Sequence, residues 1–494
     1  MARKKSWGLR GFLAAFAAVL IALAALPATA LAGEATGNRE IEISQLQPGD
    51  KVSIYKVVTY AYHQETDTYS MSFVDGLAEA LSPLTIAQYN DMDNDAAKSV
   101  ADQMATYMRT LDQSENPNLV TDYPITVSGN SHTATLGIGQ YLVLVTPGDN
   151  NTSAVYQNAL INVEPQYSGG TWSLVANPSA LEMKQSKIEV TKTVENADGT
   201  QAAITDDFGN MVGDTLKFTA SFEIPVYPSD FTDKTLTFFD VMSDGLTFEG
   251  EDTVTVALED GSELDASTYT YGADSNGFTL TFVYDKITQF AGQKVVVTYE
   301  ATINENATVR NPETNTATLE YSNGPSTSET SDEVLVYTYG LRLIKVDADN
   351  ETTKLAGATF NVYKSVEQGT PSAVDLGDEV YGVLVGTITT GDGANGTVLG
   401  EAYIEDLGAG TYYLKETAAP DGYQLDQSIH SVEVGPETDG TTAEYVVDTK
   451  VSNTKTPSLP VTGGEGTIAI TATGVVLIAG AAALIVRARR QHNN

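Results

Sequence analysis

The 494-residue sequence predicts a mainly β protein built of tandem β-sandwich domains, and three observations support this fold class. Alternating apolar and polar residues recur along the chain, as in 51–57, 294–299 and 411–415, and this alternation is typical of half-buried strands. Clusters of Gly, Asn and Asp, typical of turns, separate these segments. The 41% hydrophobic content, with 25 Tyr and 14 Phe, supplies enough apolar surface for folded cores.

The first and last segments of the chain predict processing signals. A basic start, an apolar run from Gly11 to Leu26 and a small-residue segment ending at Ala32 are typical of a secretory signal peptide over residues 1–32. The alternative, a first transmembrane helix, would need a longer run of about 20 apolar residues. Near the other end, an uncharged stretch from Gly466 to Val486 precedes three arginines, which predicts one membrane span with a cytoplasmic tail.

Between these ends we expect three folded domains, covering residues 34–183, 184–337 and 338–456. The boundaries are placed where polar or proline-containing stretches, Asn177–Lys187 and Ser322–Asp332, precede a new alternating segment. Short strands at regular spacing predict an immunoglobulin-like sandwich in each domain. Residues 83–111 are the exception and predict an amphipathic helix in the first domain, with these side chains on its apolar face: Ala96, Ala97, Val100, Met104, Met108 and Leu111.

Charge and composition exclude several classes of function. The chain carries 65 acidic and 27 basic residues, a net charge of −38, which disfavours nucleic acid as a partner. It has no cysteine, so disulfides, thiolate metal sites and cysteine nucleophiles are excluded. Few histidines and no hydrolase motif argue against a surface hydrolase, and the Asp91–Asp95 cluster lacks the pattern of a calcium loop. We therefore expect no metal and no cofactor.

Two domains each place a lysine, an acid and an asparagine in phase with buried apolar residues. Because side chains alternate along a strand, Lys192, Asp240 and Asn315 fall on the apolar faces of three segments of the middle domain. In the last domain Lys345, Glu416 and Asn453 do the same. A single such lysine is most simply a residue at a strand edge with its amine in solvent, but the order Lys, acid, Asn occurs twice.

The chemistry of such a trio predicts a covalent cross-link. Burial lowers the pKa of a lysine and raises that of a carboxylic acid, which favours a neutral amine and a protonated acid. The amine is then a nucleophile, and the acid can polarise the asparagine carboxamide. Attack on the side-chain carbon would release ammonia and leave a Lys–Asn isopeptide bond.

The last domain and the C-terminal segment carry motifs of a known family. Residues 412–423, with Glu416 inside them, match the E-box pattern YxLxETxAPxGY of Gram-positive pilins. The segment Leu459-Pro460-Val461-Thr462-Gly463, followed by the apolar stretch and arginines, resembles the cell-wall sorting signal. Segments around Lys192, Asp240 and Asn315 resemble the isopeptide-forming second domain of major fimbrial subunits, and the segment after Lys345 resembles the opening of a Cna-B-type domain. Together these resemblances cover essentially the whole chain.

The resemblance implies that a sortase cleaves between Thr462 and Gly463 and joins the Thr462 carboxyl to an amine, either of peptidoglycan or of a neighbouring pilin subunit. It also implies the bonds Lys192–Asn315, assisted by Asp240, and Lys345–Asn453, assisted by Glu416. The expected protein is a wall-anchored shaft subunit of a pilus on a Gram-positive cell surface, and its only chemistry is the formation of its own cross-links. The alternative is a monomeric or accessory wall-anchored adhesin whose first domain binds a host or bacterial surface ligand.

The acceptor lysine for polymerisation is less defined. The family places it in a YPK-like motif at the end of the first domain, and no Tyr-Pro-Lys occurs there in this sequence. Lys184 is the first candidate and Lys187 the second, with an ordinary solvated lysine as the alternative for each. In the first domain, Lys56 and Asn162 also lie in strand-like segments, but no partner acid is evident, and we expect both to be structural.

Overall fold

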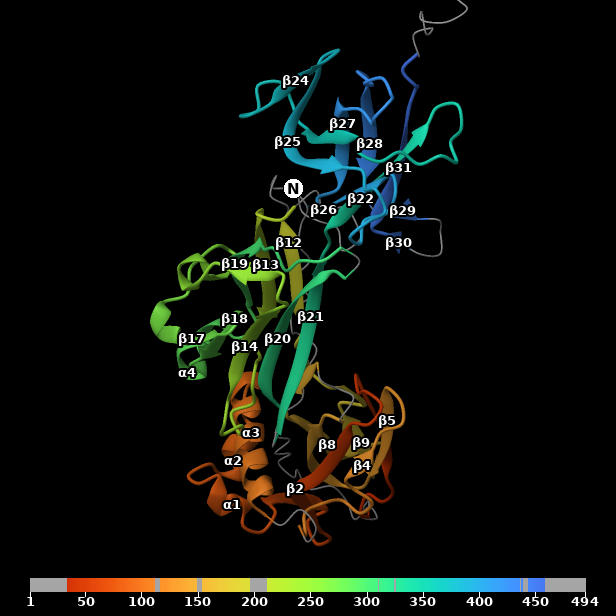
Figure 1. Cartoon of the computed structure of the whole chain (residues 1–494). Coiled ribbons are helices and arrows are strands. Elements are labelled where there is room, and N and C mark those ends of the chain that lie inside the picture. The colour runs from red at the N-terminus through yellow and green to blue at the C-terminus, as the bar shows by residue number, and fades with distance from the viewer. Residues whose placement is uncertain are drawn as a thin grey trace, which may run out of the picture. The chain divides into compact units, whose positions relative to one another are not determined.

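The computed structural model describes residues 33–111, 116–148, 153–195, 211–309, 311–323, 326–435, 437–438 and 443–457 (Figure 1). The chain divides into two compact units, residues 1–337 and 338–494. The expected signal peptide, the LPVTG segment and the C-terminal apolar stretch lie outside the described residues. Among the helices that are described, none is long and apolar enough to cross a membrane.

The first part of unit 1 is built around a six-stranded sheet with strand order β3-β2-β6-β8-β9, to which β4 adds by pairing with β2. A three-stranded sheet, β10-β1-β5, and the pair β11-β7 complete it. The strands are β1 (Arg39–Ser44), β2 (Lys51–His63), β3 (Thr68–Phe73), β4 (Ile125–Thr126), β5 (Ser131–Leu136), β6 (Gly139–Thr146), β7 (Ala154–Tyr156), β8 (Ala159–Ser168), β9 (Thr171–Asn177), β10 (Ala180–Glu182) and β11 (Gln185–Lys187).

The helices of this part gather on one side of the large sheet (Figure 1). The single helix expected over 83–111 is two helices, α2 (Ile86–Asn90) and α3 (Asn94–Thr110), and a short α1 (Leu77–Ala80) precedes them. The break occurs because the Asp93 side chain accepts a hydrogen bond from the Ala96 N–H at 2.9 Å and caps a new helix. The expected apolar face of α3 is confirmed at Val100, Met104 and Met108, which are buried in the core, whereas Ala96 and Ala97 are only partly buried.

The second part of unit 1 consists of two sheets that enclose one hydrophobic core. The first sheet has the order β12-β13-β19-β15, with β16 also pairing with β19, and the second has the order β17-β18-β14-β20-β21. The strands are β12 (Val190–Glu195), β13 (Thr215–Glu223), β14 (Leu236–Met242), β15 (Leu246–Phe248), β16 (Thr255–Leu258), β17 (Tyr269–Asp274), β18 (Gly277–Phe282), β19 (Lys294–Ile303), β20 (Glu313–Asn323) and β21 (Ser326–Val336). The short helices are α4 (Tyr284–Ile287), η1 (Glu251–Thr253), η2 (Ala266–Thr268) and η3 (Thr288–Phe290).

Two polar stretches that marked boundaries in the sequence are not free linkers. Most of Ser322–Asp332 lies in β21, which pairs with β20 along its length and forms the edge of its sheet. Polar side chains are suited to this position because one face of an edge strand meets solvent. Within Asn177–Lys187, β10 pairs with β1 and β11 pairs with β7. Backbone hydrogen bonding between strands therefore organises both stretches.

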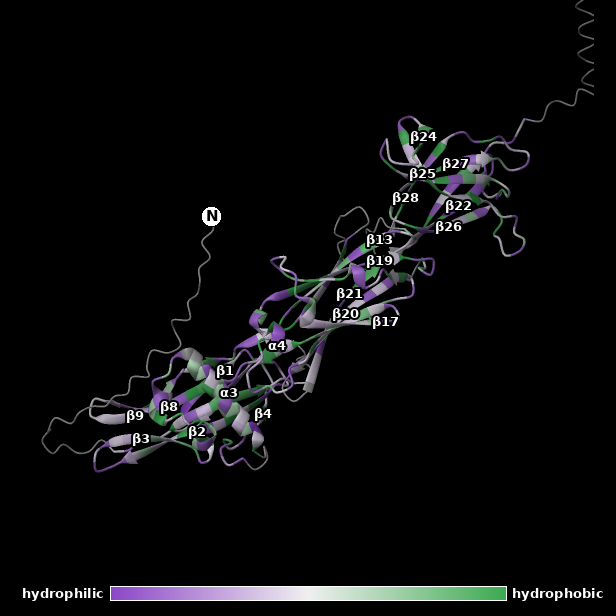
Figure 2. Ribbon diagram, turned by 90° about the vertical axis from the view of Figure 1, so that its left-hand side faces the viewer, coloured by the Kyte–Doolittle hydropathy of each residue, from purple (hydrophilic) through white to green (hydrophobic). Residues whose placement is uncertain are grey.

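Unit 2 contains a three-stranded sheet, β26-β22-β31, and a five-stranded sheet, β24-β25-β23-β27-β28, with a small pair β29-β30. The strands are β22 (Tyr339–Asp347), β23 (Thr359–Ser365), β24 (Val374–Gly377), β25 (Val380–Thr389), β26 (Glu401–Leu407), β27 (Gly410–Ala418), β28 (Ile429–Val434), β29 (Glu437–Thr438), β30 (Ala443–Glu444) and β31 (Val446–Asn453). The first and last long strands, β22 and β31, are parallel neighbours. Along the strands of both units, hydrophobic and hydrophilic residues are interspersed (Figure 2), which fits the alternation found in the sequence.

Candidate functional site: two buried lysine–acid–asparagine trios

The first trio lies in the core of the second part of unit 1, between its two sheets. Lys192 comes from β12 in one sheet, and Asp240 and Asn315 come from the adjacent strands β14 and β20 of the other. Each residue is in phase with buried apolar neighbours, as the alternation predicts. All three are buried, with Lys192 only 1% exposed and the other two 0%.

The three side chains are in direct contact. The Lys192 Nζ donates a hydrogen bond to the Asn315 Oδ1 at 2.8 Å and forms an ion pair with the Asp240 Oδ2. The amine therefore touches the carboxamide that it would attack. The described residues provide no hydrogen-bond partner for the Asp240 Oδ1.

Burial shifts both titratable groups of this trio toward their neutral forms. Desolvation lowers the pKa of Lys192, and the opposing attraction of Asp240 is smaller. Desolvation likewise raises the pKa of Asp240, with Lys192 partly offsetting it. A neutral amine beside a protonated acid is the pair of forms that the cross-linking chemistry requires.

The sequence prediction missed a fourth member of this site. Tyr299, on β19, is 1% exposed, and its hydroxyl contacts Lys192, Asp240 and Asn315. Tyr299 is in phase with the buried Val295 and Val297, so the alternation of β19 does indicate that its side chain faces the core. That signal is not distinctive, because a buried tyrosine in phase with apolar neighbours is common in a chain with 25 tyrosines.

The second trio lies inside unit 2. Lys345 comes from β22, Glu416 from β27 and Asn453 from the end of β31. Strands β22 and β31 pair in parallel, and Asn453 lies opposite Asp347 of β22. Their exposed fractions are 0%, 3% and 2%. The E-box also contacts the first strand directly, because the Tyr423 hydroxyl donates to the Asp347 Oδ2 at 2.9 Å.

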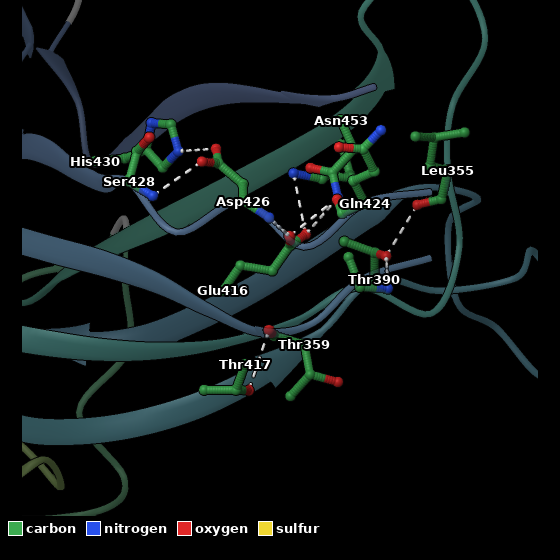
Figure 3. A network of polar contacts seen from close by, with 12 residues as sticks. Leu355, Thr359, Thr390, Glu416, Thr417, Gln424, Asp426, Ser428, His430 and Asn453 are labelled. Carbon is green, nitrogen blue, oxygen red and sulfur yellow. Dashed lines mark hydrogen bonds and ion pairs between the residues drawn. The ribbon is translucent and has the colours of Figure 1, made fainter. Parts of the chain in front are cut away.

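Glu416 joins the other two residues of this trio. Its Oε1 lies 3.2 Å from the Lys345 Nζ, and its Oε1 and Oε2 accept from the Asn453 Nδ2 at 3.1 and 3.0 Å. The Asp426 N–H also donates to the Glu416 Oε2 at 2.6 Å, and the Gln424 carbonyl accepts from the Asn453 Nδ2 at 2.9 Å (Figure 3). Burial lowers the pKa of Lys345, more than its attraction to Glu416 raises it.

The candidate acceptor lysines are both exposed. Lys184 lies between β10 and β11, flanked by the buried Met183 and by Gln185, and its carbonyl accepts from the Gln157 N–H at 2.8 Å. Lys187 ends β11, and its Nζ lies 2.5 Å from the Glu189 Oε1. In the described part of the chain, only Lys187 of the two has an ion-pair partner.

Lys56 and Asn162 of the first domain have separate partners. The Lys56 Nζ donates to the Ile138 carbonyl at 3.0 Å. The Asn162 Nδ2 donates to Glu164 at 2.8 Å, and its Oδ1 accepts from Tyr60 at 3.1 Å. Each therefore has a structural role in its own hydrogen-bond pattern.

Three segments of the chain match known families. Residues 212–325 match the Gram-positive pilin backbone subunit 2, Cna-B-like domain, and residues 340–450 match a prealbumin-like fold domain. Residues 451–493 match the LPXTG cell wall anchor motif. The Cna-B-like description thus falls on the second part of unit 1, and the prealbumin-like description falls on unit 2.

The proteins that the chain resembles include two relatives known by sequence and a solved pilin structure. It is 29% identical over 250 residues to the trypsin-resistant surface T6 protein of Streptococcus pyogenes serotype M6, covering 45% of this chain and 42% of that protein. It is 27% identical over 362 residues to the fimbrial subunit type 2 of Actinomyces naeslundii, covering 66% of this chain and 64% of the relative. Both alignments span less than two thirds of the relative's length.

The fold of this chain is shared by a solved structure, the T6 backbone pilin of serotype M6 Streptococcus pyogenes. That pilin is described as a modular three-domain structure. The TM-score is 0.57 at 20% identity, over 86% of this chain and all of that one. The chain therefore resembles Gram-positive pilin proteins over residues 212–325 and 340–450 and in its anchor motif. It carries the motif of proteins anchored in the cell wall, and its place is therefore the cell surface.

Proposed function

We propose that this chain is a structural backbone subunit of a covalently polymerised pilus, organised as three domains over 34–183, 184–337 and 338–456. A sortase cleaves it between Thr462 and Gly463 and joins Thr462 to a lysine of the next subunit or, at the base, to peptidoglycan. The observation that carries this proposal is the burial of two lysine–acid–asparagine trios in a chain with a pilin backbone match over 212–325. We further propose immunoglobulin-like sandwiches and a membrane span over 466–486 before cleavage.

Each trio forms an isopeptide bond without an external enzyme. The neutral lysine Nζ attacks the asparagine Cγ, and the protonated acid assists the loss of the carboxamide nitrogen, which Glu416 contacts directly in the second trio. The new bond joins Nζ to Cγ, the bond from Cγ to Nδ2 breaks, and ammonia leaves with a proton from the amine. The 2.8 Å contact between the Lys192 Nζ and the Asn315 Oδ1 supports this assignment in the middle domain.

The bonds stabilise the domains as disulfides would. Lys192 and Asn315 are 123 residues apart, and a cross-link over that separation removes roughly 5 kcal/mol of unfolded-state entropy in the chain-entropy description. The second bond closes a loop of similar length. Because each bond joins the opening strand of a domain to its last or next-to-last strand, it resists separation of the chain ends under tension.

The intact mass tests the cross-links directly. We expect the full chain to be lighter than its sequence mass by about 34 Da, because each bond releases one ammonia of about 17 Da. Peptide mapping should find the branched peptides Lys192–Asn315 and Lys345–Asn453. A mass equal to that of the sequence, after correction for signal-peptide removal, would contradict both assignments.

Glu416→Gln should remove the second bond selectively. Gln keeps the shape of the side chain but cannot supply a proton to the Asn453 carboxamide, so we expect the mass deficit to fall from about 34 to about 17 Da. The Lys192–Asn315 peptide serves as the internal control. If Glu416→Gln retained both branched peptides at the parent level, Glu416 would not be the assisting acid.

The pilus assignment is tested on cells. A backbone subunit should give a ladder of high-mass species on blots of surface extracts, and deletion of the pilin-type sortase should abolish it. The alternative, a monomeric or accessory wall-anchored adhesin, predicts a single band or incorporation only as a minor component of a ladder made by another protein.

A further inference from the structure

The Tyr299 hydroxyl is the one described group that contacts all three members of the middle-domain trio. The Lys192 Nζ donates to it, and it donates to the Asp240 Oδ2. The Asn315 Nδ2 donates to it at 3.2 Å. The hydroxyl therefore touches both the attacking nitrogen and the nitrogen that would leave.

The fold holds this hydroxyl between the two sheets. Tyr299 and Lys192 belong to the same sheet, where β13 separates β19 from β12, and both side chains reach across toward Asp240 and Asn315. The Tyr299 ring stacks on Phe218 at 5.6 Å between centroids and contacts the edge of Phe278 at 5.0 Å. This packing fixes the ring and leaves only its polar end in the trio.

The proposed reaction requires a proton to move between two nitrogen atoms. The amine must lose a proton after its attack, and the carboxamide nitrogen must gain one to leave as ammonia. In the second trio one carboxyl group reaches both atoms, since Glu416 contacts the Lys345 Nζ at 3.2 Å and the Asn453 Nδ2 at 3.0 Å.

The shorter acid of the first trio does not reach both atoms. Within the described residues Asp240 contacts Lys192 and Tyr299 but makes no hydrogen bond to Asn315. The side chain of Asp is one methylene shorter than that of Glu, and the tyrosine hydroxyl occupies the intervening position. Asp240 and Tyr299 together thus make the set of contacts that Glu416 makes alone.

We propose that Tyr299 is a catalytic residue of the Lys192–Asn315 cross-link and relays the proton from the Lys192 Nζ to the Asn315 Nδ2. The hydroxyl accepts the proton that the amine loses and donates its own proton to the leaving nitrogen. Tyrosine is regenerated, the Nζ–Cγ bond replaces the Cγ–Nδ2 bond, and ammonia leaves. This inference rests on the proposed isopeptide chemistry.

The test is the rate of cross-linking in Tyr299→Phe. Full chains are synthesised in a pulse, chased, digested at intervals and assayed for both branched peptides by mass spectrometry. We expect the Lys192–Asn315 peptide to form about 10²-fold more slowly or not at all, in the range of a lost general acid–base group. The Lys345–Asn453 peptide of the same molecules should form at the parent rate.

Tyr227→Phe is the matched control, because it removes another buried hydroxyl of this domain, one that donates to the Thr235 carbonyl at 3.0 Å. It should leave both rates unchanged. Equal rates in Tyr299→Phe and the parent would overturn the relay while the cross-link itself stands. Absence of the Lys192–Asn315 peptide from the parent would overturn both the relay and the proposed cross-link of this domain.

If Tyr299→Phe fails to fold, difluorotyrosine placed at position 299 keeps the ring and the hydroxyl but makes the hydroxyl more acidic. A relay predicts a changed rate for the Lys192–Asn315 bond only, because proton-transfer rates follow the acidity of the relaying group. An unchanged rate would overturn the proposal.

Discussion

Asn315→Ala is expected to lower the unfolding temperature of the middle domain by roughly 10–20 °C. The substitution removes the carboxamide that Lys192 contacts at 2.8 Å and with it the proposed cross-link over 123 residues, worth roughly 5 kcal/mol. For a domain of about 150 residues each kcal/mol corresponds to about 2–4 °C. Calorimetry of the full chain measures the shift, and the intact mass should show a deficit of one ammonia, about 17 Da, instead of two.

Asn323→Ala provides a matched control for this variant. Asn323 lies on the same strand, is 3% exposed and donates to the Ser328 Oγ at 3.0 Å, so it is a buried asparagine outside the trio. We expect it to cost about 1–3 kcal/mol, as for one lost buried hydrogen bond, with both cross-links intact. If the Asn315→Ala and Asn323→Ala variants unfold at the same temperature, the result would contradict a stabilising bond at Asn315.

Lys184→Arg is expected to abolish the polymer ladder and leave monomeric, wall-linked protein. Arginine keeps the positive charge and length of the side chain, but its guanidinium stays protonated and cannot attack the sortase acyl intermediate. Lys184 suits the acceptor role because its side chain is exposed while its carbonyl is hydrogen-bonded to Gln157. Blots of surface extracts from cells with the pilin-type sortase measure the ladder.

Lys187→Arg is the matched variant, three residues away and also exposed. Its amine lies 2.5 Å from Glu189, and this ion pair makes it less available as a nucleophile. We expect its ladder to equal that of the parent. A ladder lost only in Lys187→Arg would transfer the role to Lys187, and a ladder kept in both variants would contradict both candidates.

The sequence by itself determined which residues face the cores. Strand alternation placed Lys192, Asp240 and Asn315 among buried neighbours, and the structure confirms that burial. It did so for Lys345, Glu416 and Asn453 as well. A period of two residues is a local property of the backbone, so it can be recognised without knowledge of how the strands pair.

The sequence could not show which buried faces meet across the sheets. Tyr299 enters the first trio because β19 and β20 lie in opposite sheets of one core, a relation that follows from long-range pairing. Composition marked Ser322–Asp332 as a boundary but did not show that most of it is a strand, because the same Ser and Thr residues suit both a loop and the exposed face of the edge strand β21. The helix break at Asp93 likewise depended on one capping hydrogen bond.

The sequence therefore determined the mainly β class, the order of lysine, acid and asparagine in two domains and the motifs that relate the chain to pilins. Only the tertiary structure decided that the three side chains of each set come together. It also decided that Asp240 lies beside Tyr299, whereas Glu416 contacts both Lys345 and Asn453 by itself. The physical reason is that hydrophobic periodicity fixes a side chain's face, whereas packing of distant strands fixes its neighbours.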